Sequence, residues 1–141
     1  MEPMHELFTR RRVEFSDTDL AGVVHFSRFF IFMETAEDEF LRALGSGFTF
    51  DHEGRPGGWP KVAVSCEYLS PLRYGDEVEI HLKVLKMTRS TITYGLTMRC
   101  RNVDIARGQT TSVCCVHGPD GGLAPIAIPP PLAGRIGIAP R

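Results

Sequence analysis

Hydrophobic residues recur at three- and four-residue steps between residues 27 and 44, which is the spacing of one face of an α-helix. Charged residues at 37–39 and at 42 form a polar strip, and glycines at 45 and 47 indicate where the helix ends. A helix that is apolar over more than half of its circumference needs a broad partner, so we expect it to lie against a β-sheet. The residues of the apolar face are Phe29, Phe30, Ile31, Phe32, Met33, Ala36, Phe40, Ala43 and Leu44.

A second pattern, the alternation of polar and apolar residues, predicts β-strands on both sides of the helix. Residues 8–15 alternate toward Val13 and Phe15, and the arginines at 10–12 are expected on the solvated face of an edge strand. Further alternating runs predict antiparallel strands over residues 61–69, 77–87, 91–101 and 108–116, the last two joined by a linker at 102–107.

Stretches rich in glycine and proline predict where regular structure stops. Residues 46–60 are expected to form a loop, and residues 126–141 an irregular surface tail. No repeat or change of composition divides residues 1–141, so we expect a single domain of the α+β class. The order of the elements places one long helix on a curled antiparallel sheet.

The composition of the chain supports a folded domain and excludes some functions. With 141 residues and a hydrophobic fraction of 43%, the chain can bury one core. The net charge of −1 argues against a nucleic-acid partner, because such binders need concentrated positive charge. A chain of this length has little material left to wall a deep pocket, so we expect an active site to be shared between subunits.

Cysteine usage and the start of the chain indicate a reduced, intracellular setting. The cysteines at 66, 100, 114 and 115 form no C-x-x-C pair, so we expect free thiols and no metal site. The polar, charged start has no signal-peptide pattern, and no apolar run reaches the ~20 residues of a membrane span. We therefore expect a cytoplasmic protein.

The turn-forming run at residues 16–22 directly precedes the helix and carries the first candidate chemistry. Asp19 in this turn is a candidate base or nucleophile, although an aspartate ahead of a helix also serves as an N-cap. Gly22 permits a close backbone approach. The unpaired N–H groups of a helix start can stabilise a developing negative charge. We expect Asp17 to be structural and to accept backbone N–H groups.

The run from Phe15 to Phe30 contains the pattern D-x-D-x-x-G-V-V-H, formed by Asp17, Asp19 and residues 22–25. Together with the aromatic helix and the later strands, over about residues 8–130, this pattern resembles the signature of the hot-dog-fold acyl-CoA thioesterases. The nearest branch is similar to 4-hydroxybenzoyl-CoA thioesterase of the Pseudomonas type and to its Tol-Pal-associated and dihydroxynaphthoyl-CoA relatives. The resemblance implies a central helix wrapped by a five-stranded antiparallel sheet, in a homodimer or homotetramer with active sites at the dimer interface.

The resemblance also implies a reaction, in which water hydrolyses an acyl thioester to the free acid and CoA without a metal or other cofactor. Asp19 is then the nucleophile or general base, and the backbone N–H groups of Phe26 and His25 hold the oxyanion. The CoA phosphates are expected at Lys86, Arg89 and Ser90. The implied substrate pocket, which would suit an aromatic or medium-length acyl group, comprises His25, Phe29, Phe32 and Trp59.

Two alternatives to hydrolysis remain open. The same fold supports hydratases and dehydratases of acyl thioesters, against which the D-x-D-x-x-G motif argues. The other alternative is a non-catalytic acyl-CoA-binding module, against which the presence of Asp19 argues. A related branch uses a glutamate on the helix as its catalytic acid, but with Asp19 present we expect Glu34 to be structural.

Overall fold

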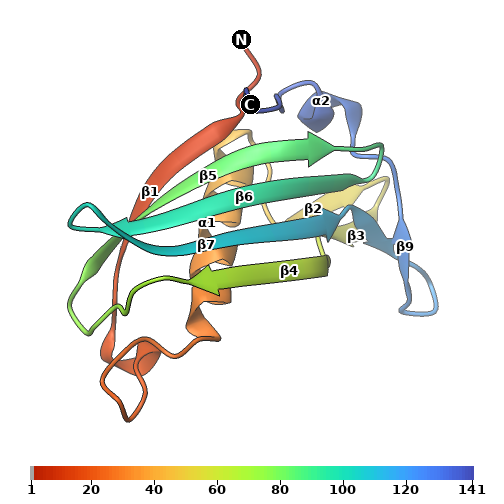
Figure 1. Ribbon diagram of the computed structural model, residues 1–141. Coiled ribbons are helices and arrows are strands. Elements are labelled where there is room, and N and C mark those ends of the chain that lie inside the picture. The colour runs from red at the N-terminus through yellow and green to blue at the C-terminus, as the bar shows by residue number, and fades with distance from the viewer. Residues whose placement is uncertain (1) are drawn as a thin grey trace.

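The computed structural model describes residues 2–141 and consists of a long helix enclosed by a curled antiparallel sheet (Figure 1). The sheet is five-stranded with the order β1-β5-β6-β7-β4, and a four-stranded sheet, β2-β3-β8-β9, lies beside it. The predicted α+β class and hot-dog arrangement are confirmed. The elements are β1 (Glu6–Arg12), the 3-10 helix η1 (Phe15–Asp17), α1 (Arg28–Ala43), β2 (Thr49–His52), β3 (Arg55–Gly58), β4 (Lys61–Tyr68), β5 (Glu77–Met87), β6 (Thr91–Cys100), β7 (Val103–Val113), β8 (Cys115–His117), β9 (Leu123–Pro125) and α2 (Pro130–Ala133).

Helix α1 is the centre of the core, and its buried residues follow the predicted three- and four-residue spacing. Phe32, Met33, Ala36 and Phe40 have no exposed surface, whereas Ile31 is 38% exposed on the outer side of the helix. Gly108 on β7 lies against the Met33 side chain, so a larger residue there would push the helix away from the sheet. Burying each large apolar side chain stabilises the fold by about 1.5–3 kcal/mol, which makes the helix–sheet contact the main source of stability.

Two predicted irregular segments form hairpins instead. Residues 46–60 contain the β2–β3 hairpin, which turns at Glu53 (φ 53°) and Gly54 (φ 79°). Its glycines and prolines hide the alternation, because Gly57 carries no side chain and leaves its place to the Phe50 ring. The predicted linker at 102–107 is also wrong, since β7 begins at Val103 and the chain reverses at Arg101 and Asn102, both with positive φ.

The C-terminal segment is packed rather than being an irregular surface tail. Ile128, Leu132 and Ile136 are each less than 8% exposed and belong to the core. The Arg135 side chain donates to the carbonyl of Leu44 at 2.7 Å, which caps the end of α1. The prolines and glycines of this segment mark its tight turns, and its three apolar side chains are spaced too widely to form a recognisable pattern.

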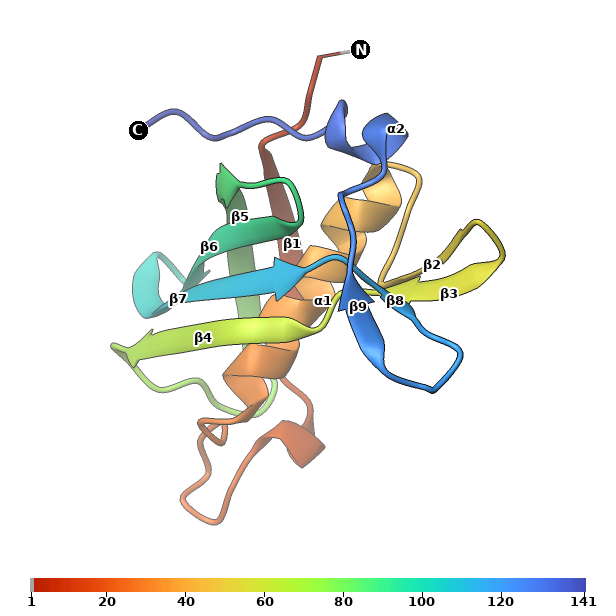
Figure 2. The same ribbon diagram turned by 90° about the vertical axis from the view of Figure 1, so that its right-hand side faces the viewer.

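The two edges of the five-stranded sheet differ in character. On β1, Arg10 pairs with Glu77 and Glu79 on the solvated face, whereas Arg11 turns inward with its guanidinium 4.6 Å from the centre of the Phe32 ring. Strand β4 forms the other edge of the sheet (Figure 2). Its apolar side chains Val62 and Val64 are 62% and 50% exposed. An apolar strand edge without charged residues at its centre is a site for pairing with another strand.

Within residues 2–141, no helix combines the length and the apolar character that crossing a membrane requires.

Candidate active site

Asp19 lies in a short hairpin-like loop that precedes α1. The Asp19 N–H donates to the Val23 carbonyl at 2.9 Å, and the Gly22 N–H donates to the Asp19 carbonyl at 3.0 Å. Gly22 has a φ of 80°, a conformation that favours glycine. Oδ1 of Asp19 accepts the Ala21 N–H at 2.8 Å, while Oδ2 has no hydrogen-bond partner among residues 2–141. The loop therefore orients an exposed carboxylate and leaves one of its oxygens available.

Asp17 anchors this loop, and its predicted structural role is confirmed. Its side chain is fully buried, with Oδ2 accepting the Glu14 N–H at 2.8 Å. Oδ1 lies 2.9 Å from Nε and 2.8 Å from Nη2 of Arg28, in the first turn of α1. Its backbone carbonyl accepts the His25 N–H at 2.9 Å. One residue thus joins both ends of the Asp19 loop to the helix.

The start of α1 leaves one predicted oxyanion donor free and occupies the other. The His25 N–H is bound by the Asp17 carbonyl, which corrects the expectation that this amide holds an oxyanion. The Phe26 N–H has no acceptor in the described part of the chain. Ser27, at the N-cap, does not cap the helix with its side chain, because its hydroxyl lies 2.7 Å from Nδ1 of His25. The Tyr68 hydroxyl donates to the Phe26 carbonyl at 2.9 Å and ties the helix start to β4.

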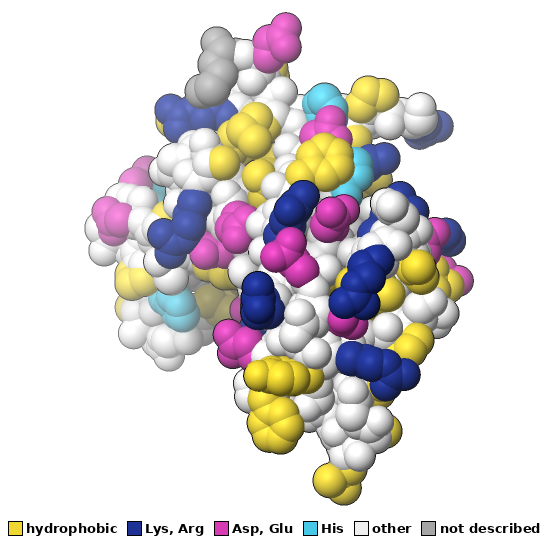
Figure 3. All heavy atoms as spheres, turned by 90° about the vertical axis from the view of Figure 1, so that its left-hand side faces the viewer, with side chains coloured by type: hydrophobic (Ala, Val, Ile, Leu, Met, Phe, Trp, Pro, Cys, Tyr) yellow, Lys and Arg dark blue, Asp and Glu magenta, His cyan; other side chains and the backbone are white. Residues whose placement is uncertain are grey.

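Two hollows meet at Asp19. The first, of about 420 Å³, lies between the loop and the end of β4 and has mostly apolar walls. The second, of about 580 Å³, lies on the other side of Asp19 and contains His25 and Arg28. Hydrophobic side chains gather at this end of the molecule, at the bottom of Figure 3. The first hollow is lined by Asp19, Val23, Val24, Phe26, Phe29, Tyr68, Leu69, Ser70, Pro71 and Leu72.

Of the predicted pocket residues, Phe29 and His25 lie with Asp19, and the other two do not. Phe29 borders the first hollow, where its ring centre is 5.2 Å from that of Tyr68. Phe32 is fully buried in the core and lines neither hollow, so its contact with substrate stays a prediction. Trp59 is 7% exposed and packs near Phe50, away from both hollows of its own chain.

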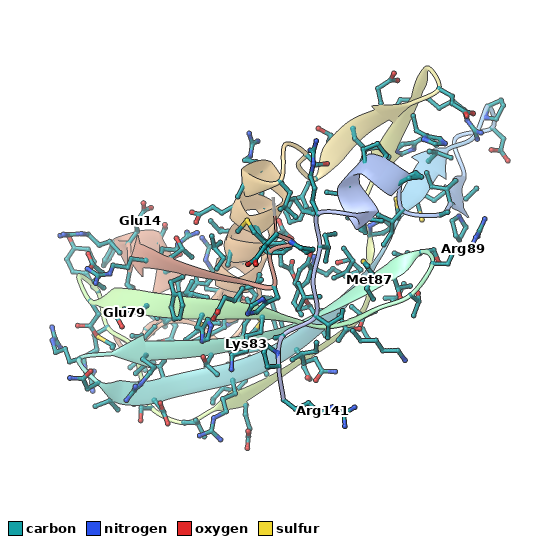
Figure 4. The ribbon with its side chains drawn as sticks, turned by 90° about the horizontal axis from the view of Figure 1, so that it is seen from above. Glu14, Glu79, Lys83, Met87, Arg89 and Arg141 are labelled. Carbon is teal, nitrogen blue, oxygen red and sulfur yellow. The ribbon has the colours of Figure 1, made fainter. Side chains whose placement is uncertain are left out.

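The predicted CoA contacts lie at the opposite end of the sheet from Asp19. Strand β5 begins beside the site loop, where the Val13 N–H donates to the Asp76 carbonyl. Lys86 stands nine positions further on from Glu77, which at ~3.3 Å per residue is about 30 Å. Figure 4 shows the same separation, with Arg89 at the far end of the sheet from Glu14. Lys86, Arg89 and Ser90 therefore do not approach the Asp19 of their own chain.

A buried polar cluster was not predicted. Glu37 was expected on the exposed polar strip of the helix, yet its side chain is fully buried. Its Oε1 accepts the Thr110 hydroxyl, and its Oε2 lies 2.5 Å from Nζ of Lys61. Burial raises the pKa of Glu37, although Lys61 and Thr110 oppose this shift. Burial also raises the pKa of Tyr94, whose hydroxyl has no partner in the described residues. Helical spacing alone cannot show that a glutamate meets a lysine from an edge strand.

The four cysteines are free thiols, as expected. Burial, together with the neighbouring Cys115, raises the pKa of Cys114 to about 11, so this thiol stays protonated at neutral pH. Among residues 2–141, no group of three His, Cys, Asp or Glu side chains is arranged to hold a metal ion.

Comparison with known proteins agrees with this geometry. A family model described as the thioesterase-like superfamily matches residues 13–136. A protein of Aquifex aeolicus, named as an inferred esterase, is 36% identical over 111 residues, covering 77% of this chain and 84% of that protein. A 1,4-dihydroxy-2-naphthoyl-CoA hydrolase of Parasynechococcus marenigrum is 35% identical over 88 residues, covering 57% of this chain and 58% of that protein. The structure of 4-hydroxybenzoyl-CoA thioesterase from Pseudomonas sp. strain CBS-3 has a TM-score of 0.78 at 15% identity, covering 92% of this chain and 98% of that chain.

The matched region contains the Asp19 loop, α1 and strands β4 to β7 of the sheet that encloses this helix, whereas the edge strand β1 (Glu6–Arg12) precedes it. The chain belongs to the thioesterase-like superfamily and is a thioester hydrolase with the hot-dog fold. The family and the enzyme class predicted from the D-x-D-x-x-G motif are thereby confirmed.

Proposed function

We propose that the protein is an acyl-CoA thioesterase in which Asp19 drives hydrolysis and the Phe26 N–H stabilises the oxyanion. The observation that carries this proposal is the free Oδ2 of Asp19 at the border of an apolar hollow that Phe26 also lines. A carboxylate, an unpaired helix-start amide and an apolar wall are what an acyl thioester needs. The relatives named for naphthoyl-CoA and benzoyl-CoA substrates support an aromatic acyl group.

Two routes use these groups in the same positions. In one, Asp19 takes a proton from water, whose oxygen forms a bond to the thioester carbonyl carbon. In the other, Asp19 attacks that carbon itself, loss of the CoA thiolate leaves an anhydride between Asp19 and the acyl group, and water then hydrolyses this anhydride. In both, negative charge develops on the carbonyl oxygen, near the N–H groups and partial positive charge of the helix start. The C–S bond then breaks, and the thiolate leaves and takes up a proton.

The proposed enzyme is a dimer formed through strand β4. A second copy of the chain would bury the exposed valines of β4. The opposite edge, β1, ends in three arginines, whose charge disfavours pairing with another strand. Strand β4 runs from Lys61, at the end that carries Arg89, to Tyr68, beside Asp19. When two copies of β4 pair in antiparallel fashion about a twofold axis, the Lys61 end of one strand lies beside the Asp19 of the other chain. Trp59 and the predicted CoA contacts then approach the site from the partner chain.

A thiol-release assay tests the function against its alternatives. Wild type should release CoA from aromatic acyl-CoAs, and Asp19→Ala should lower kcat by about 10²–10⁴, the usual contribution of general-base catalysis. Asp51→Ala is the matched control, since Asp51 is exposed on β2 and outside both hollows. Thiol release that Asp19→Ala leaves unchanged would overturn the mechanism. Binding of acyl-CoA without release would favour the binding module, and addition of water to an enoyl-CoA would favour the hydratase.

A further inference from the structure

We propose that Lys61 is a specificity-determining residue that reaches the acyl hollow of the partner chain and hydrogen-bonds an oxygen at the far end of the acyl group. The inference rests on the proposed thioesterase function and names the acyl groups it selects. These are acyl groups with a hydroxyl or carboxylate oxygen on the side away from the thioester.

The ammonium of Lys61 is held in place and keeps a free donor. Its Nζ lies 2.5 Å from Oε2 of Glu37 and 3.1 Å from Oγ of Ser112, and 5.1 Å from the centre of the Phe48 ring. A lysine ammonium has three N–H donors, and the third has no acceptor in the described part of the chain. The Lys61 side chain is 24% exposed, so it is partly open to solvent in the single chain.

The groups that hold Lys61 come from the rigid interior of the fold. Glu37 is buried on α1, and its second oxygen accepts the hydroxyl of Thr110 on β7. Ser112, also buried, lies opposite Lys61 on the same strand. A lysine with two of its donors fixed by buried side chains is oriented in advance, so a substrate oxygen does not have to order a mobile chain.

A β-bulge in β4 turns the Lys61 side chain toward the helix side of the sheet. Lys61 pairs with Ser112 and Ala63 with Thr111, so one extra residue stands in β4 at this point. In a regular strand, Lys61 and Tyr68 would face opposite sides because they are seven positions apart. With the bulge, Lys61 and Tyr68 both face the helix, where they contact Glu37 and Phe29 respectively.

The register of a β4 pair brings Lys61 beside Tyr68 of the partner chain. Directly opposite residues of an antiparallel pair face the same side of the sheet, so the twofold axis must pass through a residue of β4. Lys61 and Val62 share one register position at the bulge, so a pairing centred on Ser65 places the partner's Tyr68 opposite this position. Lys61 faces the same side as Tyr68, which lines the acyl hollow.

The chemistry of recognition follows from this placement. An acyl group with its thioester at Asp19 extends along the apolar wall toward β4, where the free N–H of the partner's Lys61 meets its far end. An oxygen there accepts a charge-assisted hydrogen bond, whereas an unsubstituted ring leaves the donor unpaired. Such a bond corresponds to a discrimination of about tenfold to a hundredfold in kcat/KM.

The test compares benzoyl-CoA with 4-hydroxybenzoyl-CoA and 4-carboxybenzoyl-CoA. Wild type should prefer the oxygenated substrates, and in Lys61→Met the ratio of kcat/KM values should fall to near one. Lys61→Met leaves the buried Glu37 unpaired, so the double variant Glu37→Gln/Lys61→Met, which buries no charge, should show the same loss in a folded protein. Lys83→Met, on the exposed face of β5, is the control and should keep the preference. A larger effect on the carboxylate than on the hydroxyl would identify an anionic acyl group as the natural one.

Mixed dimers test whether Lys61 acts across the interface. A dimer of one Asp19→Ala chain and one Lys61→Met chain contains one site with an intact Asp19 and an intact Lys61 only if these residues come from opposite chains. This dimer should recover the wild-type preference, which neither parent homodimer shows. A preference unchanged in Lys61→Met, or not recovered in the mixed dimer, overturns the inference. Absence of thiol release from wild type would instead overturn the proposed function.

Discussion

The backbone carbonyl of Asp17 accepts the N–H of His25 at 2.9 Å, and this bond closes the loop that presents Asp19. It also leaves the Phe26 N–H as the free amide of the pair predicted to hold the oxyanion. Because Asp17 binds Arg28 with its side chain as well, the Asp19 loop and the first turn of α1 are joined at two points. The geometry between Asp19 and the Phe26 N–H is thus set by a residue that the proposed reaction does not use.

Removal of the Asp17 carboxylate should therefore destabilise the fold and disturb the site together. In Asp17→Ala, the Glu14 N–H and the partly buried Arg28 guanidinium lose their acceptor. Breaking a buried pair from one side costs about 3–5 kcal/mol, and urea unfolding should show a loss at the lower end because Arg28 is partly exposed. Asp104→Ala, which breaks an exposed pair with Arg99, should change stability by less than about 1 kcal/mol. Equal losses in the two variants would contradict the anchoring role of Asp17.

Gly22→Ala should lower activity more than stability. At Gly22, φ is 80° and an added Cβ would meet no atom within 4 Å, so the penalty is conformational and not steric. A left-handed backbone conformation costs a non-glycine residue about 1–2 kcal/mol. We expect the loop to relieve this strain by changing its conformation, which shifts Asp19. Thermal unfolding and kcat measured on the same preparation separate the two effects. An Ala variant with wild-type kcat would show that the Asp19 position tolerates a change of turn.

The buried Glu37 should make stability depend on pH in a defined direction. Burial raises its pKa above the ordinary value of 4.5, so the folded state holds the proton more tightly than the unfolded state. The resulting stabilisation is complete below pH 4.5 and is lost as pH rises through the pKa of the folded protein. Urea unfolding of wild type and Glu37→Gln between pH 4 and 8 measures this difference. Wild type should lose stability relative to Glu37→Gln as pH increases, and a difference that stays constant would refute the shift.

A charge placed at the centre of β4 should prevent dimer formation. Val64→Lys alters a side chain that is 50% exposed in the single chain, so the monomer should fold, while a paired strand would bury two like charges. Sedimentation should then show monomer where wild type is dimeric, with loss of thioesterase activity. Phe8→Lys, which introduces the same charge at an exposed position on β1, should leave the dimer intact. A wild type that is active as a monomer would disprove the shared site.

Much of the fold follows from local patterns, which explains which predictions from the sequence are correct. The helical spacing of Phe29 to Leu44 determines α1 and its buried face, and strict alternation determines β5. The turn residues around Gly22 determine the Asp19 loop. Each of these signals lies within one segment, where helix, strand and turn geometry act directly on neighbouring residues.

Only the tertiary structure decided which distant segments meet. It brings Tyr68 and residues 69–72 to the wall beside Asp19, and it buries Glu37 against a lysine from the far edge of the sheet. The bulge that turns Lys61 toward the helix leaves no mark on the alternation of β4. Polarity along a chain encodes which face of an element is buried, but not the partner against which it packs. For this protein, the sequence by itself determined the helix, the sheet and the Asp19 loop, and the packing of the edge strand decided how the candidate site around that loop is built.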